Sequence, residues 1–125
     1  MASTGDSVGL LLDTGHLAFA GADPVDIAWR HGSRISHVHC KDVQPDVLAR
    51  TRAADQSFLD SVIDGVFSVP GDGAIDFAAV LSALKTANYR GWLVVEAEQD
   101  PAKAPPLVYA RRGFAYLSAA LRDLG

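Results

Sequence analysis

Two uninterrupted apolar runs, each followed directly by an acidic residue, constrain the fold of this chain more than any other feature. Residues 8–13 read Val-Gly-Leu-Leu-Leu-Asp, and residues 92–97 read Trp-Leu-Val-Val-Glu-Ala. Runs without alternation are typical of parallel strands that are covered on both faces, although a short buried helix would look the same. Parallel strands need helices to connect them, so the sequence predicts an α/β fold.

Two further segments are predicted to be strands. Residues 34–40 are short and rich in β-branched side chains, and residues 66–69 form a weaker third candidate. The segments that follow the strands at 8–13 and 34–40 have the composition of connections. We expect a turn at 14–16 and an irregular polar loop over 41–56.

Four helices are expected between and after the strands. Asp23 and Pro24 have the residue types of an N-cap and a first helical residue, and Gly32 is expected to close that helix. A second helix is expected over residues 58–64. Asp76 is expected to cap a third, and Pro105 and Pro106 are expected to open the last. The apolar stripes expected to be buried are Phe77, Val80, Leu81 and Leu84 in the third helix, and Leu107, Ala110, Phe114, Leu117, Leu121 and Leu124 in the last.

The order of strand and helix repeats four times, which predicts parallel strands with right-handed crossovers. Two architectures fit four βα units: a small doubly wound sheet, or half of a (β/α)₈ TIM barrel. A whole barrel typically needs about 250 residues, and this chain has 125.

Composition excludes several classes of protein. The net charge of −4 argues against a nucleic-acid partner and against an anionic membrane surface. No apolar run approaches the length of a membrane span, and residues 1–7 lack the features of a signal peptide. We expect residues 1–7 to be disordered and residues 8–125 to form the folded part. The lone cysteine, Cys40, suits a reducing cytoplasm.

Polar side chains at the ends of three predicted strands indicate a metal site. Asp13, His39 and Glu96 each lie at or near the carboxyl end of a strand, where ligands gather in α/β folds. Alternation along the strands places His39 with His37, and Glu96 with Trp92, on one face. Two carboxylates and one imidazole suit Mn²⁺ or Co²⁺, with Mg²⁺ as a further option, better than structural zinc.

Each of these residues also has a simpler interpretation. Asp13 can be a helix cap, and His39 can be an ordinary core or surface residue. Glu96 is harder to explain in this way, because a buried carboxylate without a partner is costly. His37 is expected to be structural. The Gly-Asp-Gly at 71–73 is expected to be only a turn, while Lys41 and Asp42 form either a solvated pair or an acid/base and orienting group.

Four motifs resemble a known family. They are Leu-Asp-Thr-Gly-His at 12–16, His-Val-His-Cys-Lys-Asp-Val at 37–43, Val-Pro-Gly-Asp-Gly-Ala-Ile-Asp-Phe at 69–77 and Trp-Leu-Val-Val-Glu-Ala-Glu-Gln-Asp-Pro at 92–101. The first two resemble the xylose isomerase-like TIM barrel superfamily. The last two are narrower and resemble its inosose dehydratase (2-keto-myo-inositol dehydratase) family, a group of lyases of inositol catabolism.

The resemblance implies a divalent metal held by Asp13, His39, Glu96 and a further Glu from a strand that has no counterpart here. It implies that His16 contacts a small keto-sugar or polyol substrate. It also implies dehydration of 2-keto-myo-inositol, with a base that removes a proton and an acid that helps the hydroxyl leave. His16, Lys41 and Glu98 are the candidates for these proton transfers.

Because the resemblance covers only the C-terminal half of such a barrel, three explanations stay open. The chain can be a fragment of a longer protein, a half barrel that a homodimer closes through its open sheet edges, or the partner of a separate N-terminal half barrel. Its function stays open in the same way. The alternatives to a lyase are a sugar or keto-acid isomerase or epimerase, and an inactive fragment or interaction module.

Overall fold

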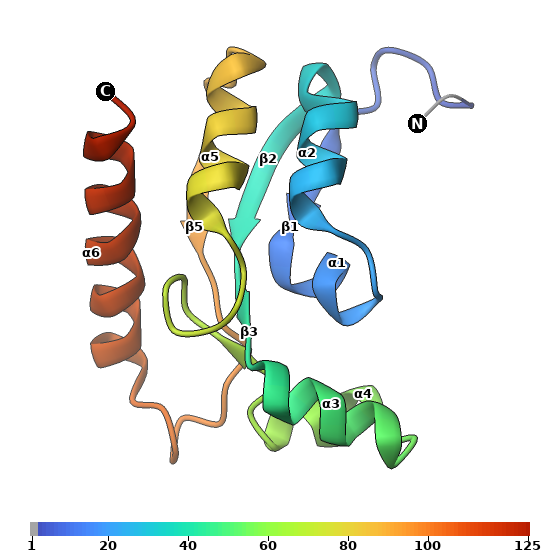
Figure 1. Cartoon of the computed structure of the whole chain (residues 1–125), viewed down its shortest axis with the longest axis vertical. Helices are drawn as coiled ribbons and strands as arrows, with labels where there is room; N and C mark the ends of the chain where they lie inside the picture. Colours follow the sequence, from blue (N-terminus) through green and yellow to red (C-terminus); the bar gives the residue numbers. More distant parts are fainter. Residues whose placement is uncertain (1–2) are drawn as a thin grey trace.

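Three parallel strands form the centre of the fold in the computed structural model, which describes residues 3–125 (Figure 1). They are β1 (Leu10–Asp13), β2 (Ile35–Cys40) and β5 (Leu93–Val95), in the order β1-β2-β5. The register sets Asp13 opposite His39 and His39 opposite Val94. The α/β class and the parallel sheet are therefore confirmed. The sheet is open and corresponds to part of a TIM barrel.

The two faces of the sheet have different surroundings. Leu12, Val38 and Cys40 are buried in one core cluster together with residues of α2 (Pro24–His31), α5 (Phe77–Thr86) and α6 (Pro106–Asp123). The opposite face is open, since Leu11 is 47% exposed and Trp92 is 76% exposed. In a barrel this second face would point inward.

Side chains cap three of the helices, and two of these caps, Asp23 and Asp76, were predicted. Asp23 accepts a hydrogen bond from the backbone N–H of Val25 at the start of α2, and Asp76 accepts from Ala79 at the start of α5. Ser57 caps α4 (Phe58–Ile63) in the same way. The predicted stripe of α5 is buried as expected, and a short 3₁₀ turn (Gly32–Arg34) joins α2 to β2.

The predicted buried face of α6 is wrong in part. Leu117 is buried and Leu124 packs against the core, but Leu107, Ala110, Phe114 and Leu121 are exposed. The helix instead turns Gly113 inward, close to Val95, Pro70 and Val69. A glycine adds nothing to an apolar stripe, so periodicity could not find the face that packs most closely.

Two other predictions are corrected. Residues 14–16 begin a short helix, α1 (Thr14–Phe19), rather than a turn. The predicted loop 41–56 contains β3 (Asp42–Val43) and α3 (Pro45–Ala53), a helix whose outer side is polar. The weak third strand exists as β4 (Phe67–Ser68), but it pairs antiparallel with β3 and does not join the parallel sheet. Within residues 3–125, the parallel sheet thus has three strands and not the four expected.

The segment before β1 is held to the rest of the chain by Arg34. Its guanidinium donates hydrogen bonds to the carbonyl oxygens of Gly5 and Val8. Residues 1 and 2 of the segment expected to be disordered lie outside the described residues, and the expectation for residues 3–7 stays a prediction. Among the described residues, no helix has both the length and the apolar character needed to cross a membrane.

Candidate metal and acid–base site

The structure brings Asp13, His39 and Glu96 together at the carboxyl end of the parallel sheet. One potential ligand atom from each lies within 4.8 Å of the others. His39 Nδ1 is 3.0 Å from Glu96 Oε2 and 3.6 Å from Asp13 Oδ2. The register explains this grouping, because Asp13 and His39 are opposite residues and Glu96 follows Val94 on the same face.

Glu96 carries the strongest sign that a cation belongs here. Its Oε2 is buried and has no hydrogen-bond partner among the described residues. His39 and Lys41 lie at ion-pair distances of 3.0 and 3.3 Å from this oxygen, yet neither contact has the geometry of a hydrogen bond. A buried polar atom left in this state is costly. The donor set of two carboxylates and an imidazole fits a divalent cation, which would remove that cost.

Asp13 caps a helix with one carboxylate oxygen and faces the cluster with the other, so the cap leaves room for the metal-ligand interpretation. Oδ1 accepts a hydrogen bond of 2.8 Å from the backbone N–H of His16 and so caps α1. Oδ2 faces His39 and lies 3.6 Å from Lys41 Nζ. Capping fixes the carboxylate while leaving one oxygen for the cluster.

A second group of side chains adjoins the first. Lys41 Nζ lies 3.0 Å from His16 Nε2 and 3.1 Å from Glu98 Oε2, and His16 Nε2 is itself 3.1 Å from that carboxylate oxygen. The three residues proposed for proton transfer therefore contact one another. Lys41 also links them to Glu96 and Asp13.

The backbone around Lys41 is fixed by two neighbours from α1. The Thr14 hydroxyl donates to the carbonyl oxygen of Lys41 at 2.6 Å and accepts from its N–H at 3.0 Å. A side chain on Gly15 would place Cβ only 2.6 Å from Lys41 Cγ, so the lysine stem needs a glycine there. Lys41 is fully buried, with its ammonium 4.9 Å from the centre of the Phe67 ring. The solvated-pair interpretation of residues 41 and 42 is therefore wrong.

Asp42 is also fully buried, and it holds a loop rather than a metal. Its Oδ2 accepts from the N–H groups of Gly71 and Gly73, and its Oδ1 accepts from those of Val43 and Ile75. These N–H groups point to a side chain of the protein itself. Residues 71–73 thus form a turn, as expected, and not a phosphate cradle.

Glu98 is held in its ionised form. Burial raises the pKa of its carboxyl, but hydrogen bonds from His16 and Lys41 and the charges of these residues lower the pKa by more. The net result is a pKa below the ordinary value of 4.5. At neutral pH, Glu98 is a carboxylate in contact with a lysine ammonium. It can accept a proton, and Lys41 can donate one.

An aromatic wall beside this cluster was not predicted from the sequence. The His16 ring lies edge-on to Phe67 at 5.3 Å and to Phe58 at 5.8 Å, and Phe19 contacts both phenylalanines. His37, expected to be structural, lies edge-on to His39 at 5.3 Å. The phenylalanines of this wall come from three separate elements, α1, α4 and β4, so no local sequence pattern groups them.

Comparison with known proteins agrees with the resemblance of the sequence motifs. A family described as "Xylose isomerase-like TIM barrel" matches residues 2–120. The "Rhizopine catabolism protein MocC" of Rhizobium meliloti is 58% identical over 113 residues, which cover 90% of this chain and 35% of that protein. The "Inosose dehydratase" of Halalkalibacterium halodurans is 52% identical over 114 residues, 91% of this chain and 38% of that protein. The "Inosose dehydratase" of Salmonella typhimurium is 49% identical over 116 residues, which cover 93% of this chain and 38% of that protein. The chain thus spans little more than a third of the length of these relatives.

Proposed function

The chain belongs to the xylose isomerase-like TIM barrel family, and on this premise we propose that it carries the metal site and the proton-transfer residues of an inosose dehydratase. The reaction is the removal of water from a keto-polyol, 2-keto-myo-inositol, in inositol catabolism. One observation carries the proposal. The buried Oε2 of Glu96, which has no hydrogen-bond partner among the described residues, lies beside three acid–base residues that contact one another: His16, Lys41 and Glu98. Relatives named inosose dehydratase support the choice of substrate.

Asp13, His39 and Glu96 would hold one divalent cation, Mn²⁺ or Co²⁺, with Mg²⁺ as the harder alternative. When bound, such a cation polarises the substrate ketone and makes the adjacent C–H acidic. The resemblance implies one more Glu ligand, which this chain does not supply. The ligands come from the ends of three neighbouring strands, so their spacing depends on the sheet and not on mobile loops.

The chain's own residues divide the proton transfers between them. The Glu98 carboxylate removes the proton next to the ketone. Because Lys41 is fully buried, its proton passes to the exposed His16 ring across their 3.0 Å contact, and His16 donates it to the leaving hydroxyl, which departs as water. The ring carbon next to the ketone loses a proton, its neighbour loses hydroxide, and a double bond forms between them. The proton on Glu98 then returns to Lys41 across their 3.1 Å contact. His16 contacts both groups and holds them in place.

The phenylalanines beside the trio suit a cyclic polyol. Such a ring has C–H groups as well as hydroxyls, and Phe58, which is 47% exposed, offers an apolar surface next to charged donors and acceptors, with the buried Phe67 behind it. We place the reaction in the cytoplasm, because Cys40 is a free, buried thiol that suits a reducing compartment.

The test measures products from 2-keto-myo-inositol with Mn²⁺ present. The chain is assayed alone and co-expressed with the part of the H. halodurans inosose dehydratase outside the matched 114 residues. Loss of water is expected in at least one arrangement, and Glu98→Gln should abolish it while Mn²⁺ binding persists. Formation of an isomer alone would instead identify an isomerase or epimerase. No conversion in either arrangement, with no Mn²⁺ binding, would leave a non-catalytic interaction module.

A further inference from the structure

The Lys41 ammonium is a buried positive charge at the edge of the candidate metal cluster. It lies 3.3 Å from Glu96 Oε2 and 3.6 Å from Asp13 Oδ2, the two carboxylate oxygens that also face His39. The first contact lacks the geometry of a hydrogen bond, and the second is longer than a hydrogen bond. Lys41 instead forms its hydrogen bond with His16 Nε2, at 3.0 Å. The two oxygens are therefore close to the lysine charge while they stay free to ligate a cation.

This charge is fixed beside the cluster, because the lysine is held at its backbone, its stem and its end. Thr14 bonds both the N–H and the carbonyl oxygen of Lys41, and Gly15 lies so close to the stem that even a methyl group would not fit between them. The Phe67 ring lies 4.9 Å from the ammonium, and the side chain has no exposed surface. A lysine at the surface could turn its charge toward water when a second cation arrives, whereas Lys41 has no such path.

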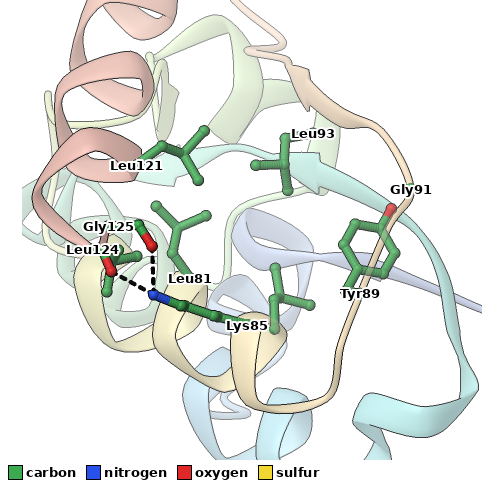
Figure 2. Close-up of a pocket in the computed structure, with 9 residues that line it drawn as sticks. Leu81, Lys85, Tyr89, Gly91, Leu93, Leu121, Leu124 and Gly125 are labelled. Carbon is green, nitrogen blue, oxygen red and sulfur yellow. Dashed lines mark hydrogen bonds between the residues drawn. The ribbon is translucent and has the colours of Figure 1, made fainter.

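Lys85 provides the contrast, because its ammonium lies among neutral groups. It donates hydrogen bonds to the carbonyl oxygens of Leu124 and Gly125, next to an apolar pocket of about 370 Å³ between α5, α6 and β5 (Figure 2). Lys85 is exposed, and the pocket reaches Leu93 at the start of β5, whereas the cluster lies beyond the other end of that strand. The position of Lys41 among carboxylates is thus a property of the candidate site.

The charges around Lys41 leave room for one divalent cation. Three carboxylates face the ammonium, those of Asp13, Glu96 and Glu98. When all three are ionised, Lys41 balances one negative charge and two remain, which match the charge of a divalent cation. The lysine nevertheless repels that cation, and it does so more strongly than a surface charge would because the site is partly buried.

We propose that Lys41 is the resident positive charge of the cluster and that it lowers the affinity of the cluster for a divalent cation. Without a metal, its charge stabilises carboxylates that would otherwise repel one another. When a divalent cation binds, the same charge weakens the complex and so keeps the binding reversible. The inference rests on the proposed function, since it concerns the metal site named there, but it gives Lys41 a role separate from proton transfer.

The test compares Mn²⁺ binding by the wild-type chain and by Lys41→Met, in which the unbranched methionine fills most of the space of the stem and removes the charge. Isothermal titration calorimetry at a fixed pH gives the two affinities. We expect Lys41→Met to bind Mn²⁺ at least about tenfold more tightly than wild type. The matched control is Lys85→Met, which removes the same charge from an exposed position and should bind Mn²⁺ within about twofold of wild type, because water and salt screen that charge.

Urea denaturation in the presence of EDTA gives a second measurement that needs no metal. Lys41→Met should lower the urea midpoint, and the loss should be smaller in a Glu96→Gln background, where one carboxylate fewer needs a balancing charge. If Lys41→Met is unfolded in EDTA, Mn²⁺ should restore its native circular dichroism, because the metal then supplies the missing positive charge. A variant that stays unfolded in excess Mn²⁺ would overturn the inference.

The remaining outcomes separate this inference from the proposed function. Mn²⁺ binding that is equal or weaker in Lys41→Met would overturn the inference alone and leave the proposed metal site standing. If neither the wild-type chain nor Lys41→Met bound Mn²⁺, the inference and the proposed metal site would both fall. Equal losses of the urea midpoint with and without Glu96→Gln would show that Lys41 balances no charge of the cluster, which would also overturn the inference.

Discussion

Replacing Asp42 by asparagine tests how strongly one buried carboxylate holds the loop beside the site. In the native chain, Oδ1 accepts from Val43 and Ile75, and Oδ2 accepts from Gly71 and Gly73. Asparagine keeps one acceptor oxygen and sets an NH₂ group against the other pair of N–H groups. Two hydrogen bonds to a charged group are lost, each worth about 1.5–3 kcal/mol, so the free energy of unfolding should fall by about 3–6 kcal/mol.

Urea denaturation followed by circular dichroism measures this change. A loss of about 4 kcal/mol lowers the urea midpoint by about 2 M when the slope is about 2 kcal/mol/M. The matched control is Asp76→Asn, because Asp76 is an exposed N-cap of α5 and asparagine caps helices as well as aspartate does. That control should change stability by less than about 0.5 kcal/mol. A loss below about 1 kcal/mol in Asp42→Asn, or equal losses in both variants, would refute the reasoning.

Three further results are expected. Burial, together with the nearby Asp13 charge, raises the pKa of Cys40 to about 12, so a thiol reagent at pH 8 should label the folded chain far more slowly than the unfolded chain; equal rates would contradict this. Gly113→Ala should lower stability by about 1–3 kcal/mol, because its Cβ would lie 2.7 Å from Val95 Cγ1, and a stabilised variant would contradict the close packing of α6. Glu98 has a lowered pKa, so its contribution to stability is present above pH 4.5 and is lost as the pH falls through the folded pKa; the stability difference between wild type and Glu98→Gln should vanish in acid and persist at pH 7.

Strand parity grouped the residues of the candidate metal cluster because alternation decides which side chains share a face, and the carboxyl ends of parallel strands meet at one edge of the sheet. Asp13 and His39 are opposite partners, and Glu96 lies on the same face as Val94. The caps Asp23 and Asp76 were also found, since an N-cap depends only on residues within one turn. These features are local, or follow from a single geometric rule.

The features that sequence reasoning missed depend on contacts between distant segments. Lys41 follows a strand and looks exposed, but α1 and Phe67 bury it. The short strand at Phe67 was expected in the parallel sheet, yet it pairs antiparallel with β3 instead. Helix α3 was missed because it has only two large apolar side chains after its first residue, Val47 and Leu48, and two adjacent residues show no helical period.

Titration with Mn²⁺ tests the central claim most directly. Glu96→Gln removes a proposed ligand, and Glu98→Gln, two residues away, is its matched control because that carboxylate contacts Lys41 and His16 instead. We predict that Glu96→Gln weakens Mn²⁺ binding by at least about 100-fold, more than is usual when a residue behind a ligand is removed, with the urea midpoint nearly unchanged. Glu98→Gln should bind Mn²⁺ nearly as wild type does. Unchanged affinity in Glu96→Gln would contradict the assignment of this cluster as a metal site.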